Sequence, residues 1–210
     1  MSFVITDILQ AKKNIDRANV YLNGKFWIGI SKNDLLLHNL IKGRELSEIE
    51  KHDVEKTVFN SKLINKAFAY IQLRPRSTAE VRDYLVLKKK ISEEDAQNVI
   101  GYLKDHNFLS DEEFTEWFIN YKTSSGINGV NKIKAELIKK GVDRKIIASL
   151  LENISKDEEF LNNQKEKIEQ FINKVRPTIK AKDSYELKTK LIQKLLARGF
   201  KYDDIKKIVK

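Results

Sequence analysis

The sequence predicts a mainly α-helical protein, in which three tandem three-helix repeats form an elongated array behind a small amino-terminal β-hairpin or sheet and a short helix. Three observations support this class. The 210 residues include two prolines and eight glycines, and 33% of them are charged, a composition that favours helix. Hydrophobic residues alternate near the amino terminus but recur about every 3.6 positions from residue 47 onward. The same hydrophobic spacing then returns three times along the chain.

The first 46 residues predict a small antiparallel sheet followed by a short helix. Two runs rich in β-branched and aromatic residues flank Asn23-Gly24, and this dipeptide favours a type I′ hairpin turn, whose two central residues need positive φ. Ser31 can cap a helix that carries leucines 35–37 and 40, and Gly43 can end it. We therefore expect residues 1–46 to form a separate amino-terminal part.

A long helix is expected to begin after Ser47. Ser47 and Glu50 have the spacing of a capping box, in which each side chain accepts a hydrogen bond from the backbone of the other residue. Hydrophobic residues keep helical spacing as far as Ile71, and Pro75 disfavours helical geometry at the residue before it. This helix opens the first repeat, for which we expect residues 47–110.

The repeats are visible as one recurring pattern of hydrophobic positions. Intervals of 4, 5, 5 and 3 residues separate five such positions in residues 133–150 and again in residues 191–208, with Gly141 and Gly199 at the same place. A third copy begins at Val81 and has one extra residue, which we place in its lysine-rich turn. The alignment gives the expected second and third repeats, residues 111–155 and 156–210. Such arrays offer long binding surfaces.

The residue types favour binding over catalysis. The chain has no cysteine, which removes disulfides, thiolate metal ligands and cysteine nucleophiles. Its three histidines, His38, His52 and His106, lack a second ligand at metal-binding spacing, so we interpret them as surface or structural groups. No apolar run approaches the roughly 20 residues of a membrane span. We expect a cytoplasmic protein that is not an enzyme, uses no cofactor and has no membrane partner.

The charge favours a polyanionic partner. The formal net charge is +10, and an excess of this kind attracts nucleic acid phosphates. A solvated lysine-rich surface is the competing interpretation. The aromatic residues Trp117, Phe118 and Tyr121 could stack on bases, but they lie on an apolar stripe, which favours a role in the core.

Basic residues recur at the carboxyl end of the second helix in each repeat, and we expect them to form a cationic ridge along one edge of the array. Lysines in such places also balance the helix dipole, which is the alternative explanation. The candidates for contact with a protein or nucleic acid partner are Arg74, Arg76, Arg82, Lys88, Lys89, Lys90, Lys132, Lys134, Lys139, Lys140, Lys194, Arg198 and Lys201.

Four segments of the chain match, in order, the signature segments of a known family. They lie at residues 74–82, 102–114, 134–142 and 195–205. In these segments the chain resembles the RecX family, the regulatory proteins of the recombinase RecA, in the longer form found in low-GC Gram-positive bacteria. The family segments mark core positions, caps and turns, so the binding candidates rest on the charge pattern alone.

The resemblance implies a non-enzymatic monomer that docks in the groove of the RecA filament on single-stranded DNA. It would mainly inhibit RecA in homologous recombination and the SOS response, with weak, sequence-independent nucleic acid binding. The second repeat is neutral overall, whereas the family is often strongly basic there. That departure argues against direct DNA contact by the middle of the array.

Two other classes remain open at this point. A stand-alone DNA-binding protein is one, because three-helix units with short turns can mimic helix-turn-helix modules that place a helix in the major groove. A purely protein-binding helical solenoid, whose charge is incidental, is the other.

Overall fold

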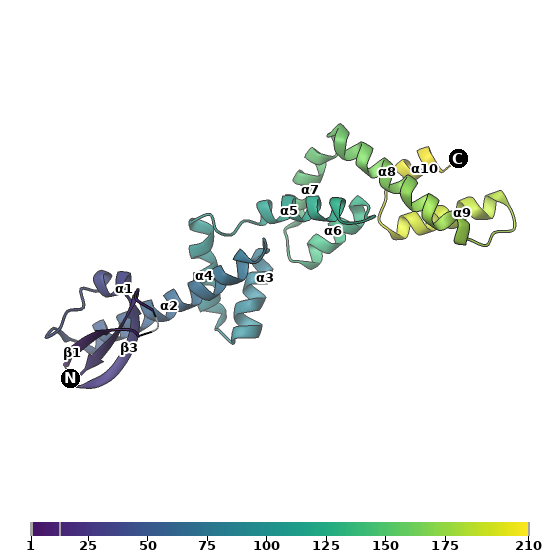
Figure 1. The fold of residues 1–210 in the computed structure, drawn as a ribbon. Helices are drawn as coiled ribbons and strands as arrows, with labels where there is room; N and C mark the ends of the chain where they lie inside the picture. The colour runs from purple at the N-terminus through teal and green to yellow at the C-terminus, as the bar shows by residue number, and fades with distance from the viewer. Residues whose placement is uncertain (1, 13, 210) are drawn as a thin grey trace. The chain divides into compact units, whose positions relative to one another are not determined.

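The protein divides into two compact units, one ending at Ala69 and the next beginning at Tyr70. The computed structural model describes residues 2–12 and 14–209. The first unit combines a small sheet with helices, and the second is built of helices (Figure 1). The boundary between the units lies inside one long helix, α2 (Glu48–Gln72).

The sheet of the first unit is antiparallel, with the strand order β3-β2-β1-β4. Its strands are β1 (Phe3–Gln10), β2 (Arg17–Leu22), β3 (Lys25–Ser31) and β4 (Glu45–Leu46). Asn23 and Gly24 join β2 to β3 with φ angles of 48° and 79°, so the expected hairpin turn is confirmed. The sequence did not indicate β4, because two residues are too few to show alternation.

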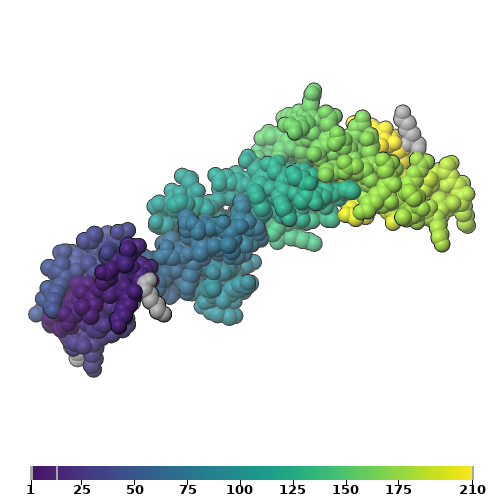
Figure 2. Space-filling view, viewed as in Figure 1, coloured from purple at the N-terminus to yellow at the C-terminus, as the bar shows by residue number. Residues whose placement is uncertain are grey.

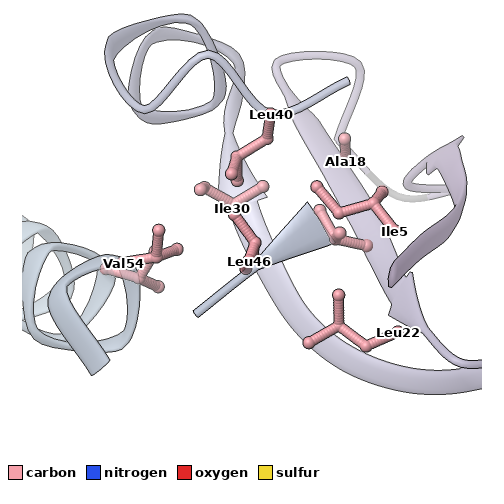
Figure 3. Close-up of a cluster of buried hydrophobic side chains, with 9 residues drawn as sticks. Ile5, Ala18, Leu22, Ile30, Leu40, Leu46 and Val54 are labelled. Atoms are coloured by element: carbon pink, nitrogen blue, oxygen red, sulfur yellow. The ribbon is translucent and has the colours of Figure 1, made fainter. Parts of the chain in front are cut away.

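Apolar side chains from the sheet and from α2 form one core (Figure 3). Ile5, Ile30 and Leu46 are almost completely buried, and Val54 and Val58 of α2 belong to the same cluster. The first compact unit therefore extends past residue 46, since the amino-terminal half of α2 covers the sheet. The residue limits expected for the four parts stay a prediction.

The short helix α1 (Lys32–Leu37) begins as expected but ends earlier. The Ser31 hydroxyl accepts a hydrogen bond from the Asp34 backbone at 3.0 Å. Asn39, with φ of 47°, turns the chain after the helix. The expectation that Gly43 ends this helix is wrong, because Gly43 lies in the loop before β4, where its N–H donates to the Ile5 carbonyl at 2.8 Å.

The long helix α2 starts and stops where the sequence predicts. The Glu50 N–H donates to the Ser47 hydroxyl at 3.2 Å, and the Ser47 N–H donates to the Glu50 carboxylate at 2.8 Å, which confirms the capping box. The helix ends at Gln72, before Pro75.

Three groups of helices make up the second unit, which also includes the end of α2. The first group consists of α3 (Thr78–Asp83), the π-helix η1 (Tyr84–Lys88) that continues it, and α4 (Glu93–Asp105). The second group consists of α5 (Asp111–Ser124), α6 (Val130–Lys139) and α7 (Arg144–Ile154). The third group consists of α8 (Glu158–Val175), a 3₁₀ turn η2 (Arg176–Thr178), α9 (Ser184–Ala197) and α10 (Tyr202–Ile208). We call them repeats 1, 2 and 3.

The aligned hydrophobic positions are the cores of these repeats. Ile133, Leu137 and Ile147 are buried together with Phe114 in repeat 2. In repeat 3 the buried cluster contains the equivalent residues Leu191, Leu195 and Ile205. Repeats 2 and 3 thus each bury one apolar stripe per helix, as the spacing predicts.

The extra residue of repeat 1 is absorbed by η1, just before the lysine-rich turn where the sequence pattern places it. The Lys89 N–H bonds to the Tyr84 carbonyl, five residues back, and a π-turn of this kind accommodates one inserted residue in a helix. Lys90 then adopts φ of 58°, the conformation that Gly141 and Gly199 adopt at 76° and 84°. With the end of α2 counted as the first helix of repeat 1, the second helices of the three repeats are α3 continued by η1, α6 and α9. All three end in the same left-handed turn.

Candidate binding surface and the junctions between repeats

The second helices of successive repeats meet end to end. At the α3/α6 junction, the Ser77 hydroxyl at the amino end of α3 donates to the Lys140 carbonyl at the carboxyl end of α6, at 2.6 Å. At the α6/α9 junction, the N–H groups of Gly129 and Asn131 donate to the carbonyls of Arg198 and Gly199, both at 2.9 Å. Helix ends carry backbone groups without partners inside the helix, and at the junctions some of those groups bond to each other.

Glycine is required where the helices touch. A Cβ atom on Gly141 would lie 2.4 Å from the Ala79 Cβ, and one on Gly199 would lie 2.3 Å from the Lys132 backbone nitrogen. Both distances are far below van der Waals contact. The sequence alignment puts the two glycines at the same place in their repeats, and the structure adds that they allow one repeat to approach the next. Lys90 has a side chain at the equivalent place in repeat 1.

A carboxylate joins two cations at the α3/α6 junction. Glu80 accepts hydrogen bonds from Arg74 and Lys140, each at 2.8 Å, and its side chain is 18% exposed. Burial alone would raise the pKa of Glu80. The hydrogen bonds from Arg74, from Lys140 and from the Ser77 backbone outweigh that effect and lower the pKa to about 2. Glu80 is therefore ionised over the physiological range and pairs the two repeats.

The predicted binding residues fall into three groups. Arg74 and Lys140 pair with Glu80, and Arg82 pairs with Glu93 at 2.6 Å. In the second group each cation lies over an aromatic ring. The distances to the ring centroids are 4.0 Å for Arg76 over Tyr70, 5.1 Å for Lys89 over Tyr84 and 5.3 Å for Arg198 over Phe171. The third group has no ion pair with another residue of the described ranges 2–12 and 14–209 and consists of Lys88, Lys90, Lys132, Lys134, Lys139, Lys194 and Lys201.

The expected cationic ridge does not follow one free edge. The carboxyl ends of α6 and α9 face the preceding repeat, because their terminal carbonyls accept hydrogen bonds there. In repeat 1 the corresponding residues, Lys88, Lys89 and Lys90, are exposed. A binding role for any of the predicted residues remains a prediction.

The aromatic residues of α5 divide between core and surface. Phe118 is buried and Trp117 is half-buried, as expected for an apolar stripe. Tyr121 is 51% exposed and its ring stacks on Trp117, with centroids 5.4 Å apart. Arg74 covers Trp117 at 5.7 Å, so this aromatic group supports the α3/α6 junction.

A further basic segment, outside the positions that recur in the repeats, spans the end of α8 and the connection to α9. Residues 174–182 contain four cations and no carboxylate: Lys174, Arg176, Lys180 and Lys182. All four are exposed. We call this stretch the α8–α9 segment. Acid-free runs with basic residues also precede α3 and α6, at residues 56–79 and 117–135. The prediction from the repeats did not include the α8–α9 segment, because that prediction used the basic residues at the carboxyl ends of the second helices.

Neither a metal site nor a membrane span emerges from the part of the chain that the structure describes. There, histidine, cysteine and acidic side chains form no group of three that could hold a metal ion. The exposed His106 bonds through Nδ1 to the Tyr102 carbonyl at 2.8 Å and stacks on the Tyr102 ring. The described helices include none that is both long and apolar enough to cross a membrane.

The fold and the linked repeats define a class of protein: a small amino-terminal sheet followed by three tandem three-helix domains. Family models match along the chain in that order. They are the regulatory protein RecX N-terminal domain at residues 3–47, and the first, second and third RecX three-helix domains at residues 64–103, 110–151 and 163–209. The chain belongs to the RecX family, which confirms the resemblance seen in its sequence.

Proteins with similar sequences are named regulatory protein RecX. The chain is 33% identical to the regulatory protein RecX of Clostridium perfringens and 30% identical to that of Clostridioides difficile. Both alignments cover 98% of this chain and 94% of the relative. A crystal structure of regulatory protein RecX has a TM-score of 0.82 at 19% identity, over 99% of this chain and 98% of the other. A RecX structure from Lactobacillus salivarius has a TM-score of 0.63 at 27% identity, over 71% of this chain and 94% of the other. The expected fold class is thereby confirmed.

Proposed function

We propose that this chain is a non-enzymatic regulator that binds the RecA filament on single-stranded DNA and mainly inhibits it in recombination and the SOS response. It acts as a monomer in the cytoplasm. Its membership of a family of regulatory proteins supports a role of this kind. The observation that carries the proposal is the set of three linked repeats with exposed basic side chains on each.

The physical argument rests on repetition. A filament of identical protomers presents the same surface at regular intervals, and repeats that are bonded to one another can contact more than one protomer at once. Exposed lysines on such repeats gain energy from nearby phosphates because neutralised phosphates release counterions. A periodic basic protein therefore suits a nucleoprotein filament better than it suits a single small ligand.

Strand exchange and ATP hydrolysis by RecA on single-stranded DNA test the proposal. We expect the purified chain to inhibit both when it is present in stoichiometric amounts. Unchanged rates at that ratio would contradict the proposed function.

A stand-alone DNA-binding protein is the rival function. Helix-turn-helix proteins read bases with the amino-terminal residues of a helix laid in the major groove. In α6 that end is bonded to Arg198 and Gly199 of repeat 3, which argues against such a role for α6. Fluorescence anisotropy on single-stranded, duplex and operator-like DNA separates the two: tight, sequence-specific binding without RecA would favour the rival, and weak, sequence-independent binding favours our proposal.

An incidental charge is the remaining alternative. A helical solenoid that binds only protein would keep its activity after Lys88, Lys89, Lys90, Lys139 and Lys140 are neutralised. We expect inhibition of RecA to weaken in that variant. Because Lys140 also supports the α3/α6 junction, a second variant, K88Q/K89Q/K90Q/K139Q, leaves the Glu80 ion pairs intact and must weaken inhibition as well.

A further inference from the structure

We infer that the α8–α9 segment, together with Tyr185, forms a binding surface for the phosphate backbone and bases of a single-stranded nucleic acid. This inference deepens the proposed function, on which it rests, by assigning contact with the DNA strand to repeat 3. It uses residues other than those predicted from the charge pattern of the second helices.

The charges of the segment are available. Lys174, Arg176, Lys180 and Lys182 are exposed, and they form no ion pair with other residues in the described parts of the chain. The nearest acidic side chains in sequence are already engaged. Asp183 accepts the Glu186 N–H at 2.7 Å as the cap of α9, and Glu186 accepts from Lys190 and from the Lys182 backbone.

The segment is also held in place. Ile179 packs against the core of repeat 3, and its N–H bonds to the Arg176 carbonyl at 3.3 Å. The Lys190 ammonium donates to the Lys180 carbonyl at 2.8 Å, and the Thr178 hydroxyl donates to the Val175 carbonyl at 2.7 Å. Because the backbone is fixed at these points, the four cations lose less conformational entropy on binding than cations on a free loop would.

An exposed aromatic side chain follows these charges closely in the sequence. Tyr185, in the first turn of α9, is 79% exposed, whereas most aromatic side chains of this chain are at least half-buried. It follows Lys182 by three residues and precedes Lys188 by three. A cavity of about 140 Å³ in the same repeat is lined by Arg176, Ser184 and Lys188, among others. Figure 2 shows repeat 3 in the green to yellow part of the colour range, and the four cations of the segment are exposed there.

This combination of side chains favours a single strand over other polyanions. Proteins that bind single strands without sequence preference join a basic surface to aromatic rings on which bases stack, and each stacked base contributes roughly 1–3 kcal/mol. An acidic protein surface would use the four cations but leave Tyr185 without a role. Duplex DNA would also use the cations and leave Tyr185 without a role, because its bases are already stacked on one another.

Fluorescence anisotropy with labelled oligo(dT), in the absence of RecA and over a range of salt concentrations, tests the charges. The variant K174Q/R176Q/K180Q/K182Q is compared with the control R144Q/K145Q/K165Q/K206Q, which removes the same charge from other exposed positions. We expect the first variant to bind at least ten-fold more weakly. Its slope of log K against log salt should fall by about 0.7 for each phosphate that is no longer neutralised, and the control should change little. Equal weakening in both variants, or none in the first, would overturn the inference.

The aromatic contribution has its own matched pair. Y185A should weaken binding to oligo(dT) by about five-fold or more, whereas Y202A, which removes a 52% exposed tyrosine of the same repeat, should not. Equal effects of the two changes would contradict a stacking role. Circular dichroism and thermal unfolding show whether each variant is folded.

Inhibition of RecA is measured separately on the same variants, so that the two proposals fail in different ways. If wild-type protein inhibits RecA and the segment variant loses inhibition while it still binds oligo(dT) normally, the surface contacts protein and our inference is wrong. If wild-type protein binds oligo(dT) through the segment but leaves RecA unaffected, the inference holds and the proposed function is wrong.

Discussion

The two junctions between repeats achieve the same contact with different chemistry. At the α3/α6 junction a serine hydroxyl and a glutamate with two cationic partners join the helix ends. At the α6/α9 junction backbone groups of Gly129 and Asn131 bond directly to backbone carbonyls. Both junctions need a glycine with positive φ where the helices touch. The shared requirement is therefore close approach, and the ionic cluster is an addition at one junction only.

That difference predicts which kind of change weakens each junction. The α6/α9 junction depends on space and on backbone geometry, so insertion of a single methyl group should disrupt it. The α3/α6 junction depends also on the charge of Glu80, so acid should weaken it. Four changes, taken from the largest expected effect to the smallest, test these statements.

The change G199A should have the largest effect. An alanine there adopts an unfavourable left-handed conformation, which costs about 1–2 kcal/mol, and its Cβ would also meet the backbone of Lys132 at 2.3 Å. We expect the free energy of unfolding to fall by about 3 kcal/mol or more, measured by urea denaturation. G24A is the control, because Gly24 has φ of +79° but nothing lies within 4 Å of its added Cβ. A decrease no greater than that of G24A would contradict close packing at this junction.

Acid should weaken the α3/α6 junction through Glu80. The pKa of Glu80 is about 2 in the folded protein against a usual 4.5, so its contribution to stability is complete above about pH 5 and is lost as the pH falls toward 2. At 1.36 kcal/mol per pH unit, the contribution is at most about 3–4 kcal/mol. We expect E80Q to lower the free energy of unfolding by about 2 kcal/mol at pH 7 and much less at pH 3. A deficit that stays constant between these pH values would show that the charge of Glu80 does not support the junction.

The change S77A removes a cap and a junction bond together. The Ser77 hydroxyl accepts the Glu80 N–H at 3.1 Å and donates to the Lys140 carbonyl at 2.6 Å. We expect a decrease of about 1.5–2 kcal/mol in the free energy of unfolding. Ser92 caps α4 by accepting the Asp95 N–H and has no bond to another repeat among the described residues, so S92A should cost about 1 kcal/mol. The difference between the decreases for S77A and S92A measures the contribution of the bond to Lys140. Equal decreases would show that this bond does not stabilise the protein.

The smallest effect is expected for the exposed ion pair of Arg82 and Glu93. Both side chains are more than 40% exposed, and solvent screens such pairs strongly. The double change R82Q/E93Q should alter the midpoint of thermal unfolding by at most a few degrees. A destabilisation as large as that of E80Q would mean that exposed charge pairs matter here as much as the partly buried Glu80 cluster does.

Much of the fold could be predicted because its signals are local. Asn23-Gly24 and the Ser47 capping box depend on neighbouring residues, and the repeats appear as one spacing of hydrophobic side chains. Strand β4 was missed because a two-residue strand is formed by its partner Phe3-Val4 rather than by its own pattern. The end of α1 was misplaced because Asn39 takes the left-handed turn that glycine usually takes.

The role of individual basic residues could not be predicted, since it depends on contacts between distant parts of the chain. Lys140 and Lys139 are neighbours in sequence, yet Lys140 bonds to Glu80 sixty residues away while Lys139 is exposed. Charge alone does not separate a lysine that joins two repeats from one that is free for a partner. The acid-free run at residues 174–182 is visible in the sequence, but only the structure shows how its backbone is fixed.

Amide hydrogen exchange at Gly129 and Asn131 tests the central claim, that the repeats are joined through the ends of their second helices. These amides lie at the start of α6, where N–H groups have no partner inside the helix and normally exchange fast. Because they donate to Arg198 and Gly199, we predict slow exchange in the wild-type chain and fast exchange in G199A. Fast exchange of both amides in the wild-type chain would contradict the claim.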